Sequence, residues 1–465
     1  MTGAATQFGR LERRGVLLGL SGAQLRLIGG AVVVAVVAVR SAGGVGLAAA
    51  APVWLLLLVA GVLSIGGRTV PSWTPVAGRW LVALVSRRTK AASTLTAAVP
   101  GSLAVPGLPG PLDVVECARL GGVLLVDRRL ATVTGVARVD GSGFLLDDEA
   151  TQVHKASAWG RVLGGLCQQP QVLRVQVLTT VAAGGMSSAR RWWREHCVAA
   201  ATGPAAALAN LLDDGFASPV QREHLVAIVV RSPRGRRRLT SIDADTVAGT
   251  LAAVGSALGA AELRVDGWLD GPGLARAVRR AYDPHSPADE VPIRVLAPVG
   301  VAEEWDRWCT GSRWHATYWI AEWPRTAVDP TFLQPLTVGE VGARTVSLVA
   351  EPVPARDALR QIRRARAEYR VDSAQRQRIG QVEDGAIAAE VEDLDRREAE
   401  LVAGHGDLRF TGLVSVSAPT RDALTDACRA VEADAARAMC DLVRLVGQQG
   451  AAHLAAALPL GRGVR

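Results

Sequence analysis

The residues that hold nucleotide phosphates in P-loop motors do not occur in this sequence. A P-loop needs G-x-x-x-x-G-K-[ST], in which a glycine-rich backbone cradles the phosphates and the lysine contacts them. The lysines of the chain are Lys90 and Lys155, and neither lies in a glycine loop. The glycine pairs at 43–44 and 121–122 are not followed by the required residues. We therefore do not expect a P-loop ATPase.

Other catalytic and metal-binding patterns do not occur either. The sequence has no G-x-S-x-G and no H-E-x-x-H, and His224 and His315 have no nucleophile or carboxylate at a diagnostic spacing. The acidic run 147–149 suits a helix start better than a metal site, because adjacent helical side chains diverge. Six scattered cysteines form no C-x-x-C pair. We predict no cofactor, no metal and free thiols, and an enzyme of unrecognised type is the alternative.

A run of arginines is the candidate for anion binding. The letters RSPRGRRR occupy residues 231–238, between a predicted strand and a predicted helix. Guanidinium groups bind the phosphates of nucleic acid or lipid, but no aromatic residues are interleaved for base stacking. A solvated turn and a phosphate contact both remain open. The residues concerned are Arg231, Arg234, Arg236, Arg237 and Arg238.

Tryptophan is concentrated in one short region. The residues are Trp305, Trp308, Trp314, Trp319 and Trp323. The alternating strand predicted at 314–323 places Trp314 on one face and Trp319 and Trp323 on the other. The cluster is either core with one exposed edge or a surface for a partner.

A basic stretch and an acidic stretch follow one another in the last third of the sequence. Arginine is dense at 356–370, and acid is dense at 383–400. Two helices with so narrow an apolar stripe should project from the body. We predict a charged helical excursion at about 355–403, which serves as a docking arm or is a mobile surface feature.

The elements that position these residues begin with an apolar hairpin at 25–67. Its second run, Leu47–Ile65, is uncharged, and its roughly 19 residues would make a helix of about 28 Å, close to the bilayer core. The first run, Leu27–Val39, reaches that length only if the flanking Arg26 and Arg40 snorkel to the headgroups. We predict a two-span transmembrane hairpin. One span plus an interfacial helix, and a cleaved signal peptide, are the alternatives.

Flanking charge predicts the orientation. Arginines stand on both sides of the hairpin, whereas its turn holds Arg40 alone, so both ends should be cytoplasmic. Residues 1–24 are then a cytoplasmic segment of a multi-pass protein of the inner membrane. Residues 68–90 suit a juxtamembrane interfacial helix, with tryptophan at headgroup depth and arginine on phosphates. Its membrane-interface residues are Arg68, Trp73, Arg79 and Trp80.

The rest of the chain reads as a cytoplasmic body. Residues 91–111 are rich in Ala, Pro, Gly and Ser and suit a linker. From 112 to 465, strands and helices alternate without a parallel-sheet rhythm, and a long helix is predicted at 422–446. We predict a membrane-anchored α+β protein whose body holds ferredoxin-like α+β domains. No repeat of fixed period is visible.

Several short motifs carry a resemblance to a known family. Tyr282-Asp283-Pro284, Trp314-His315-Ala316-Thr317, Glu322-Trp323-Pro324 and the Phe332–Leu336 motif resemble an actinobacterial membrane-protein family of conjugation-type gene clusters. The front hairpin resembles the PrgI-like inner-membrane subunit. The strands and turn of 121–146 and the tail from Leu413 resemble the start and end of the amino-terminal domain of the type IV secretion and conjugation ATPase.

The resemblance implies a function without a motor. In the ATPase family the motor domain would begin about where this chain stops, so a separate ATPase would supply the energy. The expected protein is a non-enzymatic inner-membrane scaffold of a conjugation or type IV-like secretion apparatus. Its expected partners are the bilayer, that ATPase, other inner-membrane subunits and further copies of itself. An EccE-like accessory subunit of type VII secretion and a membrane-tethered nucleic-acid-binding module are the alternatives.

Overall fold

The structure is a computed structural model of the whole chain. It describes residues 22–65, 68–86, 89–92, 101–141, 143–183, 187–197, 203–214, 220–285, 300–324, 326, 328–338, 342–378, 385–403 and 406–462. The predicted cytoplasmic segment 1–24 lies almost wholly outside these residues.

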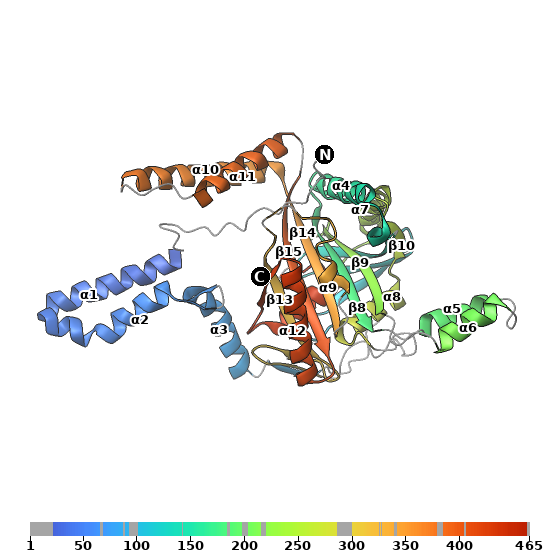
Figure 1. Cartoon of the computed structure of the whole chain (residues 1–465), viewed down its shortest axis with the longest axis horizontal. Coiled ribbons are helices and arrows are strands. Elements are labelled where there is room, and N and C mark those ends of the chain that lie inside the picture. Colours follow the sequence, from blue (N-terminus) through green and yellow to red (C-terminus); the bar gives the residue numbers. More distant parts are fainter. Residues whose placement is uncertain are drawn as a thin grey trace.

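The N-terminal helix α1 (Gly22–Ala49) is long and apolar enough to cross a membrane, and it is the one such helix among the described residues. Its regular part ends at Ser41, because Ala42 and Gly43 leave helical geometry. This part measures about 30 Å. α2 (Ala51–Val62) then runs back along α1, and Gln24 Nε2 donates to the Gly61 carbonyl at 3.0 Å. Both helices lie outside the body (Figure 1).

The relative lengths of the two apolar helices differ from the prediction. The second run was expected to give the longer helix, yet α2 has 12 residues, about 18 Å. Pro52 suits only the first turn of a helix and so sets the start of α2. Leu63 is extended and ends it. Two full membrane spans are therefore not shown.

Fourteen strands of the described chain form one antiparallel sheet. Their order is β3-β11-β12-β13-β15-β14-β8-β9-β7-β6-β5-β4, with β10 paired to β7 and β16 to β13. The strands are β3 (Lys90–Ala92), β4 (Ser102–Leu103), β5 (Leu112–Cys117), β6 (Gly122–Asp127), β7 (Thr132–Asp140), β8 (Val172–Ala183), β9 (Val220–Arg231), β10 (Arg264–Trp268), β11 (Gly300–Glu303), β12 (Trp308–Cys309), β13 (Trp314–Glu322), β14 (Ala343–Val353), β15 (Asp407–Ala418) and β16 (Asp441–Arg444). A separate two-stranded ribbon joins β1 (Ser64–Ile65) to β2 (Arg68–Thr69).

Twelve of these strands form two units with the same connectivity, and β3 and β4 lie at the two ends of the sheet. In unit 1, from β5 to α8, the strand order β10-β7-β9-β8 is built from β7, α4, β8, β9, α7 and β10 in turn. In unit 2, from β11 to α13, the order β16-β13-β15-β14 is built from β13, α9, β14, β15, α12 and β16. The units meet where β8 pairs with β14. The two units repeat the order and pairing of their strands and helices, but not the identity of their residues. For this reason no repeat is visible in the sequence.

Each unit also carries a helical arm between its second and third core strands. α5 (Ser187–His196) and α6 (Pro204–Asp214) form the arm of unit 1, and α10 (Ala355–Arg378) and α11 (Gly385–Val402) form that of unit 2. The two arms project on opposite sides of the body (Figure 1). The residues of the predicted excursion at 355–403 form this helix pair, and Arg366 bridges α10 to Asp395 of α11 at 2.7 Å.

The helices cover both faces of the sheet. One face carries α4 (Glu149–Leu166), α7 (Ser241–Ala260), α9 (Gln334–Val338) and α12 (Arg421–Arg437). The other carries α8 (Gly271–Tyr282) and α13 (Gln449–Ala457). α13 is almost entirely buried, and its small residues allow it to lie close against the strands. A 3₁₀ turn, η1 (Phe144–Leu146), precedes α4.

Two predicted boundaries differ in the body. Residues 101–111 were expected to be linker, but β4 lies in the sheet and Leu103 and Val105 belong to the core. The long helix expected at 422–446 is α12 followed by β16. The break comes at Met439, whose φ of +54° is left-handed, and the residues beyond it gain ladder bonds with β13.

Candidate membrane–body junction

Helix α3 (Val70–Val85) joins α1 and α2 to the body. Its Trp73 and Trp80 pack on Trp305, with ring centroids 6.4 and 5.5 Å apart. Val76, one turn from each tryptophan, is buried in the same contact. The body closes over Trp305 with Gly447, whose N–H donates to the Trp305 carbonyl at 2.6 Å. A side chain at Gly447 would meet Trp305 at 2.7 Å and Val76 at 2.9 Å.

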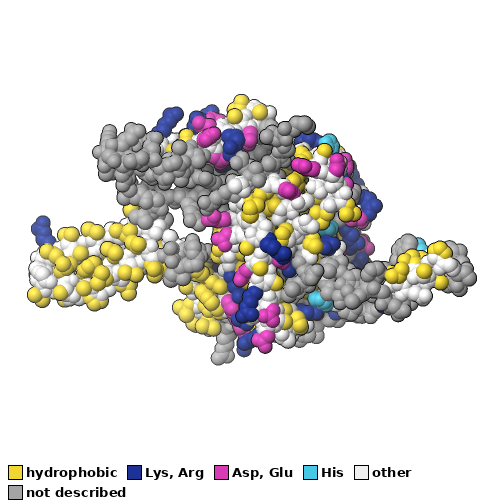
Figure 2. Space-filling model, viewed as in Figure 1, with side chains coloured by type: hydrophobic (Ala, Val, Ile, Leu, Met, Phe, Trp, Pro, Cys, Tyr) yellow, Lys and Arg dark blue, Asp and Glu magenta, His cyan; other side chains and the backbone are white. Residues whose placement is uncertain are grey.

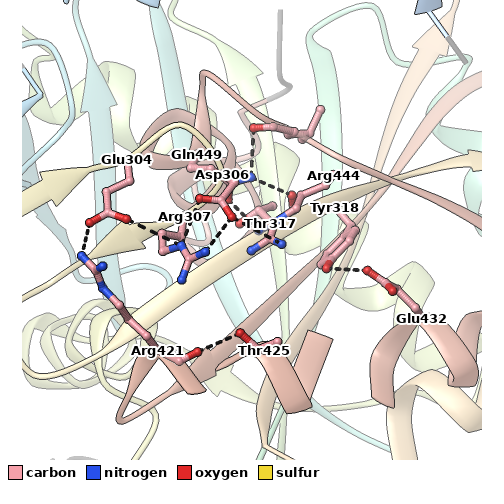
Figure 3. Close-up of polar contacts among 11 residues, drawn as sticks. Glu304, Asp306, Arg307, Thr317, Tyr318, Arg421, Thr425, Glu432, Arg444 and Gln449 are labelled. Carbon is pink, nitrogen blue, oxygen red and sulfur yellow. Dashed lines mark hydrogen bonds and ion pairs between the residues drawn. The ribbon is translucent and has the colours of Figure 1, made fainter. Parts of the chain in front are cut away.

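An ion-pair network holds the loop that presents Trp305 (Figure 3). Glu304 bonds Arg421 of α12, and Asp306 bonds Arg307 at 2.9 Å. The hydrogen bond from the Arg307 side chain lowers the pKa of Asp306, so this carboxylate stays charged at neutral pH. Arg444 of β16 lies 3.8 Å from the same carboxylate. The tryptophan is therefore presented by a loop tied to two elements of unit 2.

Gln449 fixes the strand beneath this loop. Its Oε1 accepts from the Thr317 N–H at 2.8 Å, and its Nε2 donates to the Thr317 carbonyl at 3.3 Å. Tyr318 extends to the other face, where its hydroxyl donates to Glu432 at 2.9 Å (Figure 3). The junction thus rests on the buried part of unit 2.

The opposite side of α3 is apolar and exposed. Leu81, Val82 and Val85 are exposed there, and Leu84, one turn beyond Trp80 on the tryptophan side, is exposed as well. Figure 2 shows apolar side chains over α1 and α2 and again beside the body at α3. Arg79 is exposed and its Nε donates to the Pro75 carbonyl of its own helix, and Arg68 lies in β2. The predicted interfacial tryptophans therefore face the body, while other residues of α3 form its free apolar side.

The five clustered tryptophans occupy different environments. Trp308 is core, 2% exposed, and Trp319 packs beside Leu413 and Leu445. Trp314 lies under the Arg421 guanidinium, 4.4 Å from it, and Trp323 packs edge-on to Phe332 and Phe410. Only Trp305, 39% exposed, lies at the junction. The structure does not bring the five together as one surface.

The predicted arginine run is divided among several contacts. Arg231 ends β9 and is exposed, and Arg234 pairs with Asp243 at 2.6 Å, next to the N-terminus of α7. Arg237 and Arg238 are exposed. Arg236 lines a surface groove together with residues that the sequence prediction missed. These are Arg128, Arg129 and Arg462. The adjacent arginines 128 and 129 in a turn between two strands were a weak signal, and Arg462 had none.

Three of the histidines and the acidic run make structural contacts. His315 and His453 are buried, and Asp148 caps α4 by accepting from the Thr151 N–H, which confirms the predicted helix start. His224 bonds Thr179 across two strands at 3.0 Å. Within the described ranges no group of three His, Cys, Asp or Glu side chains could hold a metal ion. The described cysteines are all free thiols.

Comparison with known proteins gives no further guide. No protein-family model matches the chain, and no curated protein matches it significantly.

Proposed function

We propose that this protein is a non-enzymatic inner-membrane scaffold of a conjugation or type IV-like secretion apparatus that docks a separate ATPase. The observation that carries the proposal is the two-sided helix α3. One side packs on Trp305 of the body, and the other exposes apolar residues, while α2 links α3 to the membrane-spanning candidate α1. A helix of this kind holds a large cytoplasmic body at the membrane surface.

The anchor in this proposal is a two-pass hairpin. α2 runs back beside α1 and is hydrogen-bonded to it through Gln24 and Gly61. If both helices span the membrane, both ends of the hairpin lie on the same side of it. The two units that follow would be ferredoxin-like, because β-α-β-β-α-β with this strand order is that motif. Reporters at the N-terminus and after Lys90 test the topology. Both should score as cytoplasmic, and opposite scores would establish a single pass.

The docking element in this proposal is the charged arm α10–α11. Its helices are ion-paired to each other, and Arg397 and Asp407, 3.3 Å apart, anchor the base of the arm. Arg360, Arg363 and Arg364 of α10 are exposed in its described part. Electrostatic complementarity between such an arm and a surface of opposite charge favours one partner over others. The resemblance to the domain beneath the PrgI-like subunit suggests that this partner is the motor.

The test is purification of the tagged full chain from its native membranes in mild detergent. We expect a P-loop ATPase to co-purify, and we expect its loss when α10–α11 is replaced by a short turn. Replacement of α5–α6, the arm in the equivalent place of unit 1, is the matched control and should leave the ATPase bound. Absence of any motor protein, or nucleotide hydrolysis by the purified chain alone, would refute the proposal. Capture of type VII core subunits instead would favour the EccE-like alternative.

A further inference from the structure

An arginine-lined groove lies on unit 1, far along the sheet from the α3 junction. Four chain segments supply its walls: Pro109, the β6–β7 turn, the loop after β9, and the C-terminal tail. The groove is open and holds about 520 Å³, much more than one phosphate needs. Its lining residues are Pro109, Arg128, Arg129, Leu130, Arg236 and Arg462. No aromatic residue is among them.

Part of this positive charge is balanced within the chain. Arg128 makes a bidentate pair with Asp113 at 2.6 and 2.7 Å, and Arg462 pairs with Asp127. These pairs fix the two guanidinium groups in place. They leave the remaining arginines of the groove to carry its net charge.

The other arginines have no carboxylate partner among the described residues. Arg129 donates to the Pro109 carbonyl at 2.9 Å, and exposed Arg236 makes no ion pair. Arg237 and Arg238 continue the same exposed loop without an acidic partner. Uncompensated guanidinium groups held along a groove form a site for a polyanion.

The repeated architecture shows that the fold does not require these arginines. The equivalent corner of unit 2 is formed by the β12–β13 turn and the β15–α12 connection, which is only Pro419 and Thr420. Unit 1 has a longer connection, from Ser232 to Thr240, and this extra length holds the arginines. The arginines of the unit 2 corner are each engaged by a carboxylate, Arg313 by Asp283 and Arg421 by Glu304.

We infer that this groove binds the phosphodiester backbone of double-stranded nucleic acid without reading its sequence. A nucleic-acid backbone carries regularly spaced phosphates, which suit an open groove with several separate arginines. The residues that line the groove include no aromatic side chain, which disfavours recognition of unstacked single strands. The inference is independent of the scaffold proposal, because it concerns a different surface.

Fluorescence anisotropy of a labelled DNA duplex with the detergent-solubilised full chain tests the inference. The triple variant Arg129→Gln/Arg236→Gln/Arg237→Gln removes three cations that hold no internal ion pair. We expect affinity at low salt to fall at least about 30-fold, and the slope of log K against log salt to decrease by about 2 to 3. A duplex should bind no more weakly than a single strand of the same length.

The matched control is Arg264→Gln/Arg360→Gln/Arg429→Gln, which removes the same charge from exposed sites away from the groove. It should change affinity by less than about threefold. Equal losses in both variants, or no binding by the native chain at low salt, would overturn the inference. Displacement of the DNA by anionic vesicles or by polyglutamate at equal charge would also overturn it, by identifying a lipid or general acidic ligand instead.

Discussion

Two buried histidines, His315 and His453, make the stability of the body dependent on pH. His315 and His453 lie with ring centroids 4.2 Å apart, beside Trp308. His453 Nε2 donates to the Ala281 carbonyl at 2.8 Å, and its Nδ1 accepts from Ser415. His315 bonds Ser417 and Thr310. Burial lowers the pKa of both rings, and that of His453 falls to about 4, because a charged ring has no water and no counter-ion here.

This arrangement predicts acid sensitivity. Above pH 6.5 the ring of His453 is neutral in both the folded and unfolded states, so it adds no pH dependence. As pH falls from about 6.5 towards 4, only the unfolded state takes up the proton, and folding stability falls by up to about 3 kcal/mol. Denaturant unfolding in detergent at pH 7 and pH 4.5 should show this loss. His453→Gln should reduce the loss, and an unchanged pH dependence in that variant would contradict the assignment.

At the scale of secondary-structure elements, α3 is held to the body by one tight contact. The helix has an apolar side for the body and another apolar side that is exposed, so hydrophobic burial alone does not decide which side faces the body. The choice comes from shape, because Trp305 fits between Trp73, Trp80 and the backbone of Gly447. Only glycine accommodates both the left-handed φ of +71° and the close approach of the tryptophan ring.

Gly447→Ala should therefore loosen α3. The added methyl group collides with Trp305 and Val76, so we expect hydrogen exchange of the α3 amides to rise by about tenfold or more. Gly311→Ala is the control, because its φ of +82° imposes similar backbone strain in open surroundings. If both variants leave α3 equally protected, the glycine contact does not hold the helix.

At the scale of the whole molecule, the two units share one sheet and one buried helix. α13 belongs to unit 2 yet contacts β8 of unit 1, and the tail beyond it returns to unit 1. Buried Gln176 of β8 joins these parts. It donates to Ser347 and to the Ala455 carbonyl, both at 2.9 Å, and accepts from the Gly461 N–H at 2.6 Å. The units should consequently unfold together.

Gln176→Leu tests this coupling. The change leaves buried polar groups of β14, α13 and the tail without their partner, at a cost of about 1 to 3 kcal/mol for each unsatisfied group. We expect one thermal transition of the body at a markedly lower temperature, as followed by circular dichroism. Exposed Gln171→Leu, near the same strand, should leave the midpoint almost unchanged. Two separate transitions in the variant would show that the units are independent.

Much of the architecture was predictable from local pattern, and the site was not. The charged arm, the start of α4 and the strands around 172–181 and 314–323 follow from periodicity and capping. The break that produces β16 was missed, because a short strand after an amphipathic helix has no local signature. The groove was missed because Arg128, Arg236 and Arg462 are distant in sequence.

The sequence by itself determined which segments avoid water and which carry charge. The free energy of transferring a side chain out of water depends on the chemistry of that residue alone. The apolar α1 and the polar arm α10–α11 could therefore be predicted from the sequence. Only the tertiary structure decided which distant segments meet. Strand pairing joined β8 to β14. Tertiary packing placed one of the five tryptophans at the junction and brought arginines from separate segments into one groove. These outcomes depend on long-range contacts whose energy no single segment contains.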